Sequence, residues 1–191
     1  ALTYSKNLTS IKTVDMLGLD TALNYGKKAG LKYAPQSHTM SALALGQFDQ
    51  PIGNRDGGNT TILASAYGAF GNNGVIYEPA LYTKVEDASG NLLLEKEPIS
   101  TKLFSPQTSY IIYDILKGSS TSAQFNDIPV AGKTGTTNSS DNFWFAGLTP
   151  YYSGSVWIGY DNPQRMNGKS SSAASLFSKI MAVAHEGLEY K

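Results

Sequence analysis

Three consecutive extended runs in the C-terminal third of the chain limit its fold more than any other feature. The runs span residues 130–136, 142–150 and 152–161, and glycine, serine, asparagine and proline separate them. Strands joined by such short turns pair in antiparallel fashion, because a parallel pair needs a crossover of about a dozen residues. We therefore expect a three-stranded antiparallel sheet in chain order, with Trp144 and Trp157 in its core.

Helical and hairpin patterns flank this sheet in the sequence. The helix over 105–118 has the strongest signals, with Ser105 as N-cap, Pro106 in its first turn, and Ile111, Ile112 and Ile115 on one face. Residues 75–98 read as two extended runs with a turn at 87–91. The other helices are predicted over 9–18 (capped by Thr9 or Ser10), 20–30 (capped by Asp20), 58–74 and 171–188. This order predicts an α+β fold, an antiparallel sheet flanked by helices.

Composition excludes several classes of function. Fifteen basic and fifteen acidic residues give a net charge of zero, so we expect no nucleic-acid partner. The chain has no cysteine and only two histidines, His38 and His185, far apart in sequence. We therefore expect no metal, no cofactor and no serine–histidine pair. No apolar run approaches the ~18 residues that a membrane span needs.

The segment Gly132-Lys133-Thr134 ends like a phosphate-binding P-loop, but the rest of that pattern is missing. A P-loop has glycine five positions before the one that precedes the lysine, and Asp127 occupies this position. The residues after Thr134 have turn chemistry, whereas a P-loop continues into a helix. The sequence therefore disfavours a phosphate site.

Lys-Thr-Gly-Thr on a strand suits another task, the binding of a peptide carboxylate beside a sheet edge. Lys133 provides a cation, Gly135 allows close approach of another backbone, and Thr134 and Thr136 provide hydroxyl donors. Strict alternation sends Lys133 and Thr134 to opposite faces. Both can serve one cleft only if the strand is a twisted edge strand.

A second motif, Ser5-Lys6-Asn7, precedes the first predicted helix. Together the S-x-N and K-T-G motifs resemble two of the three motifs of penicillin-binding proteins. Residues 1–20, 42–79 and 131–161 look like consecutive segments of the transpeptidase domain of the class A, bifunctional members. The resemblance covers nearly the whole chain and implies the penicillin-binding protein and serine β-lactamase-like fold.

The third motif of that family, Ser-x-x-Lys, is absent from this chain, because no serine is followed by lysine three positions later. The resemblance thus implies that residues 1–191 are the C-terminal part of a transpeptidase domain, whose fold is incomplete here. It also implies a second chain that carries the nucleophilic serine. The parent would be anchored at the extracytoplasmic face of the bacterial membrane through an N-terminal segment absent from this chain.

The resemblance assigns roles residue by residue. Ser5 would relay a proton, and Lys133 would keep the local field positive and orient Ser5. Asn7 would hydrogen-bond the substrate amide. Thr134, Gly135 and Thr136 would line the site for the terminal carboxylate of a D-Ala-D-Ala stem peptide or a β-lactam, with the Thr136 N–H as half of an oxyanion hole. Asn138 would lie at the rim.

One function is expected, and three alternatives to it stay open. The expected activity is D,D-transpeptidation of peptidoglycan stem peptides, with acylation by β-lactam antibiotics. A D,D-carboxypeptidase or a serine β-lactamase would use the same K-T-G motif. A module that senses β-lactams or peptides without turnover is the alternative from outside the enzymes.

Overall fold

A computed structural model describes residues 2–46 and 57–189 of the chain. Its centre is an antiparallel sheet of three strands in the order β5-β6-β7, with bounds β5 Ala131–Thr136, β6 Asn142–Leu148 and β7 Ser153–Gly159. The register pairs Lys133 with Ala146 and Trp144 with Trp157. The predicted sheet and its chain order are confirmed, and so is the α+β class.

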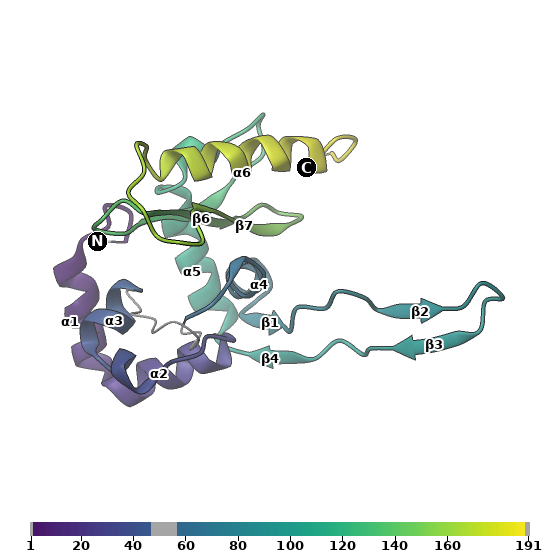
Figure 1. Ribbon diagram of the computed structural model, residues 1–191, viewed down its shortest axis with the longest axis horizontal. Coiled ribbons are helices and arrows are strands. Elements are labelled where there is room, and N and C mark those ends of the chain that lie inside the picture. The colour runs from purple at the N-terminus through teal and green to yellow at the C-terminus, as the bar shows by residue number, and fades with distance from the viewer. Residues whose placement is uncertain (1, 47–56, 190–191) are drawn as a thin grey trace.

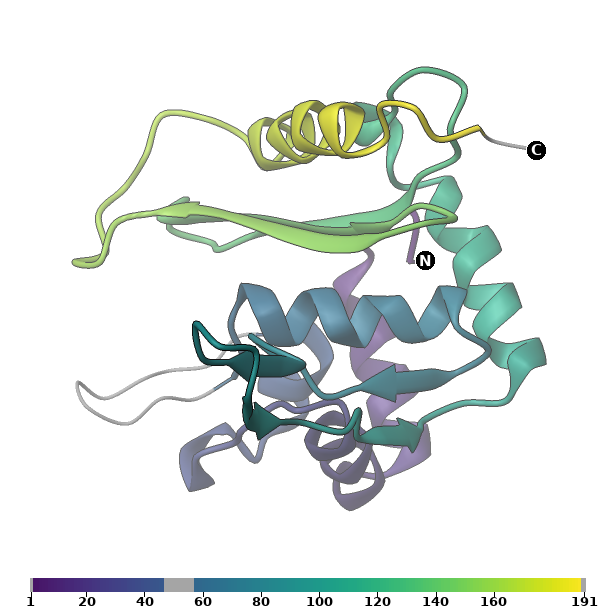
Figure 2. The ribbon, with the colours of Figure 1, turned by 90° about the vertical axis from the view of Figure 1, so that its right-hand side faces the viewer.

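Helices cover both faces of this sheet, as Figure 2 shows from the side. One face carries the C-terminal helix α6 (Ser171–Ala184), and the other carries α4 (Thr60–Gly71) and α5 (Pro106–Lys117). Beyond α4 lie three further helices, α1 (Asn7–Leu17), α2 (Leu19–Lys28) and α3 (Met40–Leu45), and a short 3-10 turn, η1 (Pro35–Ser37). The sheet is therefore the middle layer of the molecule.

Three glycines explain how α6 packs so closely on its face of the sheet. Gly132, Gly147 and Gly154 form a row across the three strands. A Cβ at Gly132 would lie 2.4 Å from Cζ of Phe145, and one at Gly154 would lie 2.7 Å from a Met181 methyl on α6. Because the row leaves no side chains there, the Phe145 ring packs beside Gly132 and Gly147, with its centre 4.9 Å from the ring centre of Phe177.

The other face of the sheet packs on α4 and α5 through a second apolar cluster. Ala131 of β5 and Leu148 of β6 are buried there against Leu116 of α5 and the partly buried Tyr67 and Phe70 of α4. Burial raises the pKa of Tyr67 to about 12, so its ring stays neutral at physiological pH. This cluster joins the K-T-G strand to the helical layer.

Two small ribbons extend from this body. Strands β1 (Val75–Tyr77) and β4 (Ser100–Lys102) pair beside α4, and β2 (Lys84–Glu86) and β3 (Leu92–Glu95) pair further out. Figure 1 shows the β2–β3 ribbon projecting away from the rest of the molecule. Asp87 accepts hydrogen bonds from the backbone of Ser89 and Asn91, which closes the predicted turn. The hairpin prediction is confirmed.

The predicted helix starts need two corrections. The first helix begins at Asn7 after Lys6, so neither Thr9 nor Ser10 is its cap, and Thr13 instead donates to the carbonyl of Thr9 inside the helix. Gly18, not Asp20, is the N-cap of the second helix, because a positive φ of 87° there allows the chain to turn between two consecutive helices.

The predicted apolar face of α5 also needs correction. Ser105 caps this helix by accepting from the N–H of Thr108, as expected. Ile111 and Ile115, however, are 57% and 38% exposed, and the buried positions are Ser109 and Leu116. The face toward the sheet is rotated because Ile112 and Leu116, four residues apart, contact the Ala131 cluster.

Candidate active site on the edge strand

The K-T-G motif lies on β5, which is an edge strand of the described sheet. Only β6 pairs with it, so alternate backbone groups of β5 face away from the sheet. The carbonyl of Gly132 accepts from the hydroxyl of Ser119 at 2.7 Å, and the carbonyl of Thr134 accepts from the Lys133 ammonium at 3.1 Å. Even-numbered residues of β5 therefore present their backbone at the free edge, whereas Thr137 donates across to Asn142 of β6.

The side chains of the motif alternate between the two faces, as the sequence predicts. Lys133 and Gly135 lie on the face of Ala131, toward α4 and α5. Thr134 and Thr136 lie opposite Phe145 and Phe143, on the face that carries α6. The edge position that both residues require for a shared cleft is confirmed.

Lys133 is a half-buried cation on the edge strand. Its side chain is half-buried, and burial lowers the pKa of its ammonium from the usual lysine value. Among the described residues no carboxylate forms an ion pair with it. A half-buried ammonium with only a backbone carbonyl as partner is available to an incoming anion.

Two tryptophans expected in the sheet core lie instead on the Lys133 face. Trp144 is half-buried beside Gly135, where a Cβ would lie 3.4 Å from the Trp144 Cβ. Trp157 is 37% exposed, its ring centre lies 6.3 Å from that of Trp144, and its N–H donates to the amide oxygen of Asn142. The core prediction for this pair is wrong, because the apolar helical layer does not extend over this end of the sheet.

The S-x-N motif forms an exposed turn that leads into α1. Ser5 has a positive φ of 51°, and its N–H donates to the carbonyl of Leu2 at 3.1 Å. Asn7, the first residue of α1, is also exposed. Within the described part of the chain no hydrogen bond joins Ser5 or Asn7 to β5.

A short series of contacts nevertheless brings the two motifs toward the same region. The methyl group of Thr3 would lie 3.4 Å from a Cβ placed at Gly118, the C-cap of α5. The next residue, Ser119, is the one that donates to Gly132, the neighbour of Lys133. Figure 2 shows the N-terminal segment rising beside this end of α5, on the α4 side of the sheet.

Asn138 lies in the exposed turn between β5 and β6. The turn is held by its neighbours, because Thr137 accepts from the backbone of Asp141 and Asn142 and donates to the Asp141 carboxylate. The hydrogen bond from the Thr137 hydroxyl, and others from the side chains of Ser139 and Asn142, lower the pKa of the Asp141 carboxyl. Asn138 is thus presented at the end of the K-T-G strand, in a turn that Thr137 and Asp141 hold in place.

The serine-rich segment after α5 has a role that the sequence did not reveal. Ser119 holds the carbonyl of Gly132, and Ser120 with Gln124 holds the carbonyl of Val130. These residues read as loop formers, yet they support the outer edge of the strand where no further strand pairs. A pair of serines directly after a helix C-cap is the one local signal that could have indicated them.

The sequence profile of the family described as "Penicillin binding protein transpeptidase domain" matches residues 1–182. The chain belongs to this family. The match includes both the S-x-N turn and the K-T-G strand, so the sequence resemblance is confirmed over almost the whole chain.

This chain has relatives that agree with the family assignment. It is 52% identical over 198 residues to penicillin-binding protein 1A of Clostridium perfringens (strain 13 / Type A), which covers all of this chain and 29% of the relative. It is 33% identical over 213 residues to penicillin-binding protein 1A/1B of Bacillus subtilis (strain 168), covering 98% of this chain and 22% of that one. The chain thus spans less than a third of the length of either relative.

Solved structures show the same fold at low sequence identity. Penicillin-binding protein 1A from Haemophilus influenzae superposes with a TM-score of 0.74 at 20% identity, over all of this chain and 34% of that one. The imipenem acyl-enzyme complex of penicillin-binding protein A from M. tuberculosis gives 0.75 at 15% identity, over 96% of this chain and 47% of that one. In the described residues no helix is both long and apolar enough to cross a bilayer.

Proposed function

We propose that this chain supplies two walls of a peptidoglycan D,D-transpeptidase site, and that the serine nucleophile comes from outside it. Residues 1–191 would then be the C-terminal part of the transpeptidase domain. The parent would be anchored at the extracytoplasmic membrane face and would cross-link the cell wall. The observation that carries the proposal is the half-buried Lys133 without a carboxylate partner, on an edge strand whose outer side pairs with no other strand among the described residues.

The outer edge of β5 at Thr136, beyond the carbonyls that Ser119 and Lys133 occupy, fits a substrate that adds to the sheet as a short extended strand. Because the Gly132 and Thr134 carbonyls face this edge, alternation points the Thr136 N–H to the same side. That N–H would stabilise the oxyanion of the tetrahedral intermediate, with the N–H of the absent serine as its partner. Gly135 leaves room for the substrate beside the Trp144 side chain.

The remaining roles divide between the two walls. The Thr134 and Thr136 hydroxyls would bind the terminal carboxylate of a D-Ala-D-Ala stem or of a β-lactam, assisted by the Lys133 charge. Ser5 would pass a proton to or from the leaving group, oriented by Lys133, and Asn7 would hold the substrate amide. Asn138 would contact the ligand from the rim.

The alternative functions differ from the transpeptidase in the reaction catalysed and not in the ligand that the site binds. A carboxypeptidase transfers the acyl group to water, a β-lactamase hydrolyses its own acyl-enzyme quickly, and a sensor turns over neither substrate. Family membership and relatives named penicillin-binding protein 1A favour the transpeptidase. Thiol release from a thioester analogue of the D-Ala-D-Ala stem separates an enzyme from a sensor. Transfer of the acyl group to an added amine, and not to water, separates the transpeptidase from the carboxypeptidase, and rapid hydrolysis of a β-lactam identifies a β-lactamase.

The decisive experiment maps the label of a fluorescent penicillin on the full-length parent protein. We expect one labelled serine, in a Ser-x-x-Lys segment outside residues 1–191, and loss of labelling with Lys133→Ala but not with Lys84→Ala, an exposed lysine of the β2–β3 ribbon. A label on any residue of this chain would refute the proposal.

The structure of the complete acylated domain gives a second, geometric test. Ser5 Oγ and Lys133 Nζ should lie within hydrogen-bond reach, roughly 2.6–3.2 Å apart. A separation above about 10 Å, several times that reach, in a well-ordered site would remove one of the two residues from the mechanism.

A further inference from the structure

A continuous series of side-chain hydrogen bonds connects the third strand of the sheet to the end of the K-T-G strand. It begins at the indole N–H of Trp157 on β7, which donates to the amide oxygen of Asn142 on β6 at 2.7 Å. The amide nitrogen of Asn142 donates to the Asp141 carboxylate at 3.0 Å, and the Thr137 hydroxyl donates to the same carboxylate oxygen. The series therefore ends one residue beyond Thr136, the last residue of β5.

A glycine on β7 allows the indole to reach Asn142. Trp157 and Gly159 lie on the same face of the strand, and Gly159 is the residue directly opposite Asn142 in the register. A Cβ at Gly159 would lie 2.4 Å from Cζ2 of Trp157 and 2.8 Å from its indole nitrogen. The ring thus occupies the space of a side chain at Gly159, and a methyl group there would displace the indole from its hydrogen bond.

The Thr137 hydroxyl fixes the other end of the series. While it donates to Asp141, it accepts from the backbone N–H groups of Asp141 and Asn142 at 3.2 and 3.1 Å, so its one donor and two acceptor positions are all used. The Thr137 N–H also donates to the Asn142 carbonyl at 3.3 Å. Both the backbone and the side chain of the residue after Thr136 are therefore held by the start of β6.

The end of β5 is where acyl transfer would need the most precise geometry. An oxyanion-hole donor acts only when it lies about 2.7–3.1 Å from the oxygen on which charge develops. A displacement of about 1 Å can lower a rate about a hundredfold. Strand pairing of β5 with β6 ends at Thr136, so the turn beyond it sets how firmly the Thr136 N–H is held.

We propose that Trp157 is a positioning residue for acyl transfer, which acts through Asn142, Asp141 and Thr137 to hold the Thr136 N–H where the oxyanion develops. The inference rests on the proposed function, because the oxyanion is that of the acylation step. Trp157 contacts no reacting atom in this role. It makes the third strand part of the support of the active site.

Two substitutions interrupt the series at Trp157 in different ways. Trp157→Phe keeps an aromatic ring and removes the N–H donor, whereas Gly159→Ala keeps every hydrogen-bonding group and displaces the indole. Stopped-flow reaction of the full-length parent with a β-lactam gives the acylation rate constant, the dissociation constant of the noncovalent complex and the final labelled fraction. We expect each variant to lower the rate constant about tenfold, as for one hydrogen bond, and to leave the labelled fraction unchanged. The dissociation constant should change much less, because the oxyanion forms only in the reaction.

Both variants should remain folded. Trp157 is 37% exposed, and Gly159 does not have the positive φ that would disfavour alanine. The turn also keeps a second support, because the Ser140 carbonyl accepts from the Met166 N–H at 2.9 Å. We therefore expect a small displacement of the turn without unfolding.

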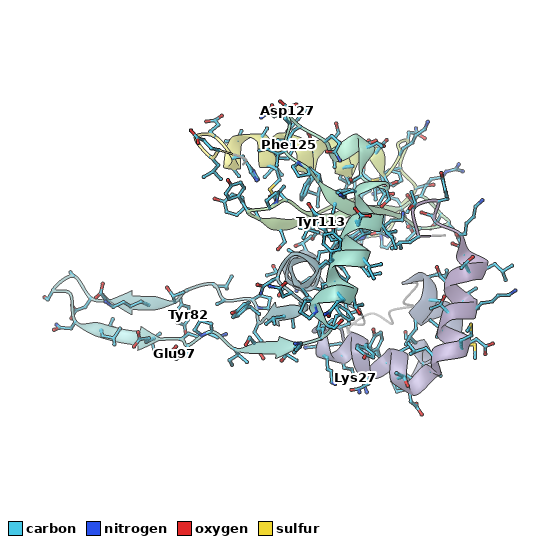
Figure 3. The ribbon with its side chains drawn as sticks, turned by 180° about the vertical axis from the view of Figure 1, so that it is seen from behind. Lys27, Tyr82, Glu97, Tyr113, Phe125 and Asp127 are labelled. Carbon is cyan, nitrogen blue, oxygen red and sulfur yellow. The ribbon has the colours of Figure 1, made fainter. Side chains whose placement is uncertain are left out.

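Variants at Thr137 and at a distant aromatic residue provide the rescue and the control. Thr137→Val should slow acylation at least as much as Trp157→Phe, and Thr137→Ser, which retains the hydroxyl, should restore most of the rate. Tyr82→Phe likewise removes one polar group from an exposed aromatic residue. Figure 3 shows Tyr82 on the projecting ribbon, away from the sheet, and this variant should leave acylation unchanged.

The variant Thr136→Val tests whether the support acts through the backbone N–H. Because this variant lacks the hydroxyl and keeps the N–H, adding Trp157→Phe to it should slow acylation by the same factor as in wild type. No further loss would show that Trp157 acts through the Thr136 hydroxyl and would overturn the assignment. An unchanged rate in both Trp157→Phe and Gly159→Ala, or a loss explained entirely by a smaller labelled fraction, would also overturn it.

Hydrogen exchange of the unreacted parent separates this inference from the proposed function. Peptides that cover residues 131–142 should exchange faster in Trp157→Phe and Gly159→Ala than in wild type, and equal exchange would overturn the inference. Wild-type protein that no β-lactam labels would instead contradict the proposed function, and the exchange measurement would still decide whether Trp157 holds the turn.

Discussion

Lys133 and Thr134 are adjacent in sequence, yet the sheet separates their environments. Lys133 faces the helical layer of α4 and α5, where burial lowers the pKa of its ammonium. Thr134 and Thr136 face the other side, opposite Phe145 and Phe143. A ligand at the outer edge of β5 would therefore meet the Lys133 ammonium on one side and the Thr134 and Thr136 hydroxyls on the other. This division allows the two kinds of group to be tested one at a time.

Thr136→Val should impair β-lactam acylation more than folding. The substitution keeps the β-branched shape on an exposed strand position and deletes only the hydroxyl. We expect the acylation rate to fall by the equivalent of about 1–3 kcal/mol, as for a hydrogen bond to a charged group. Stopped-flow acylation of the full-length parent measures this, with Thr134→Val as the comparison, for which we expect a smaller loss. An unchanged rate would remove the Thr136 hydroxyl from the site.

Lys133 should set an alkaline limit to acylation. Its charge is present below the ammonium pKa and is lost as pH rises through it, and burial places that pKa below the usual lysine value. The acylation rate should therefore decline at a lower pH than the ~10.4 of a free lysine. Lys133→Arg, which stays charged, should move this decline to higher pH. A pH–rate profile that is identical in the two proteins would contradict the role.

The charge on Lys133 should assist acylation but disfavour folding. Because the pKa of Lys133 is lower in the folded than in the unfolded chain, the charged form slightly disfavours folding at neutral pH, and this penalty disappears as pH rises. Stability measured alongside acylation thus distinguishes loss of charge from loss of structure.

At the scale of elements, β5 is held by a neighbouring strand on one side and by serine hydroxyls on the other. Ser119 donates to the Gly132 carbonyl, and its own position is fixed by a 3.0 Å contact with the Leu116 carbonyl at the end of α5. The end of α5 therefore sets where the K-T-G strand lies. Ser119 is a positioning residue that acts through β5.

Ser119→Ala should lower the acylation rate about tenfold by loosening the strand, with only a small fall in melting temperature, because one hydrogen bond contributes about 1 kcal/mol. Ser119→Thr, which retains the hydroxyl, should restore most of the rate. The matched control is Ser122→Ala, at an exposed serine of the adjacent turn η2 (Thr121–Ala123). A melting-temperature loss that accounts for the whole rate change would show that Ser119 serves folding alone.

The whole molecule leaves much apolar surface uncovered. Leu8 and Met16 of α1 are 67% and 89% exposed, as are Tyr110 and Ile111 of α5 at 67% and 57%. Soluble monomers rarely expose contiguous apolar patches above a few hundred Å². If residues 1–191 are part of a larger transpeptidase domain, as we propose, we expect the remainder of that domain to pack on these helices.

Residues 1–191 expressed alone should therefore be unstable and should form no covalent adduct with penicillin. We expect aggregation or a broad, weakly cooperative thermal transition, and co-expression with the remaining part of the domain should restore a sharp one. Calorimetry and intact-mass analysis after penicillin treatment measure both properties. A stable, monomeric, penicillin-labelled fragment would contradict the prediction.

The sequence by itself determined the elements and their order. Alternating runs with short turns required the antiparallel β5-β6-β7 sheet, and Ser105 and Pro106 marked the start of α5, because these signals act over a few residues of backbone. The order of motifs identified the family before any coordinates. The roles of all the site residues in the two motifs and of Asn138 stay predictions.

Tertiary structure alone decided which faces are buried and which groups meet. Ile111 and Ile115 follow the helical period as well as Leu116 does, but only contact with Ala131 selects the buried side. The supports at Ser119, the exposure of Trp157 and the unsatisfied Ser109 depend on residues distant in sequence. Local pattern limits the conformation of a segment, whereas burial and pairing at an edge depend on which other segments fold against it.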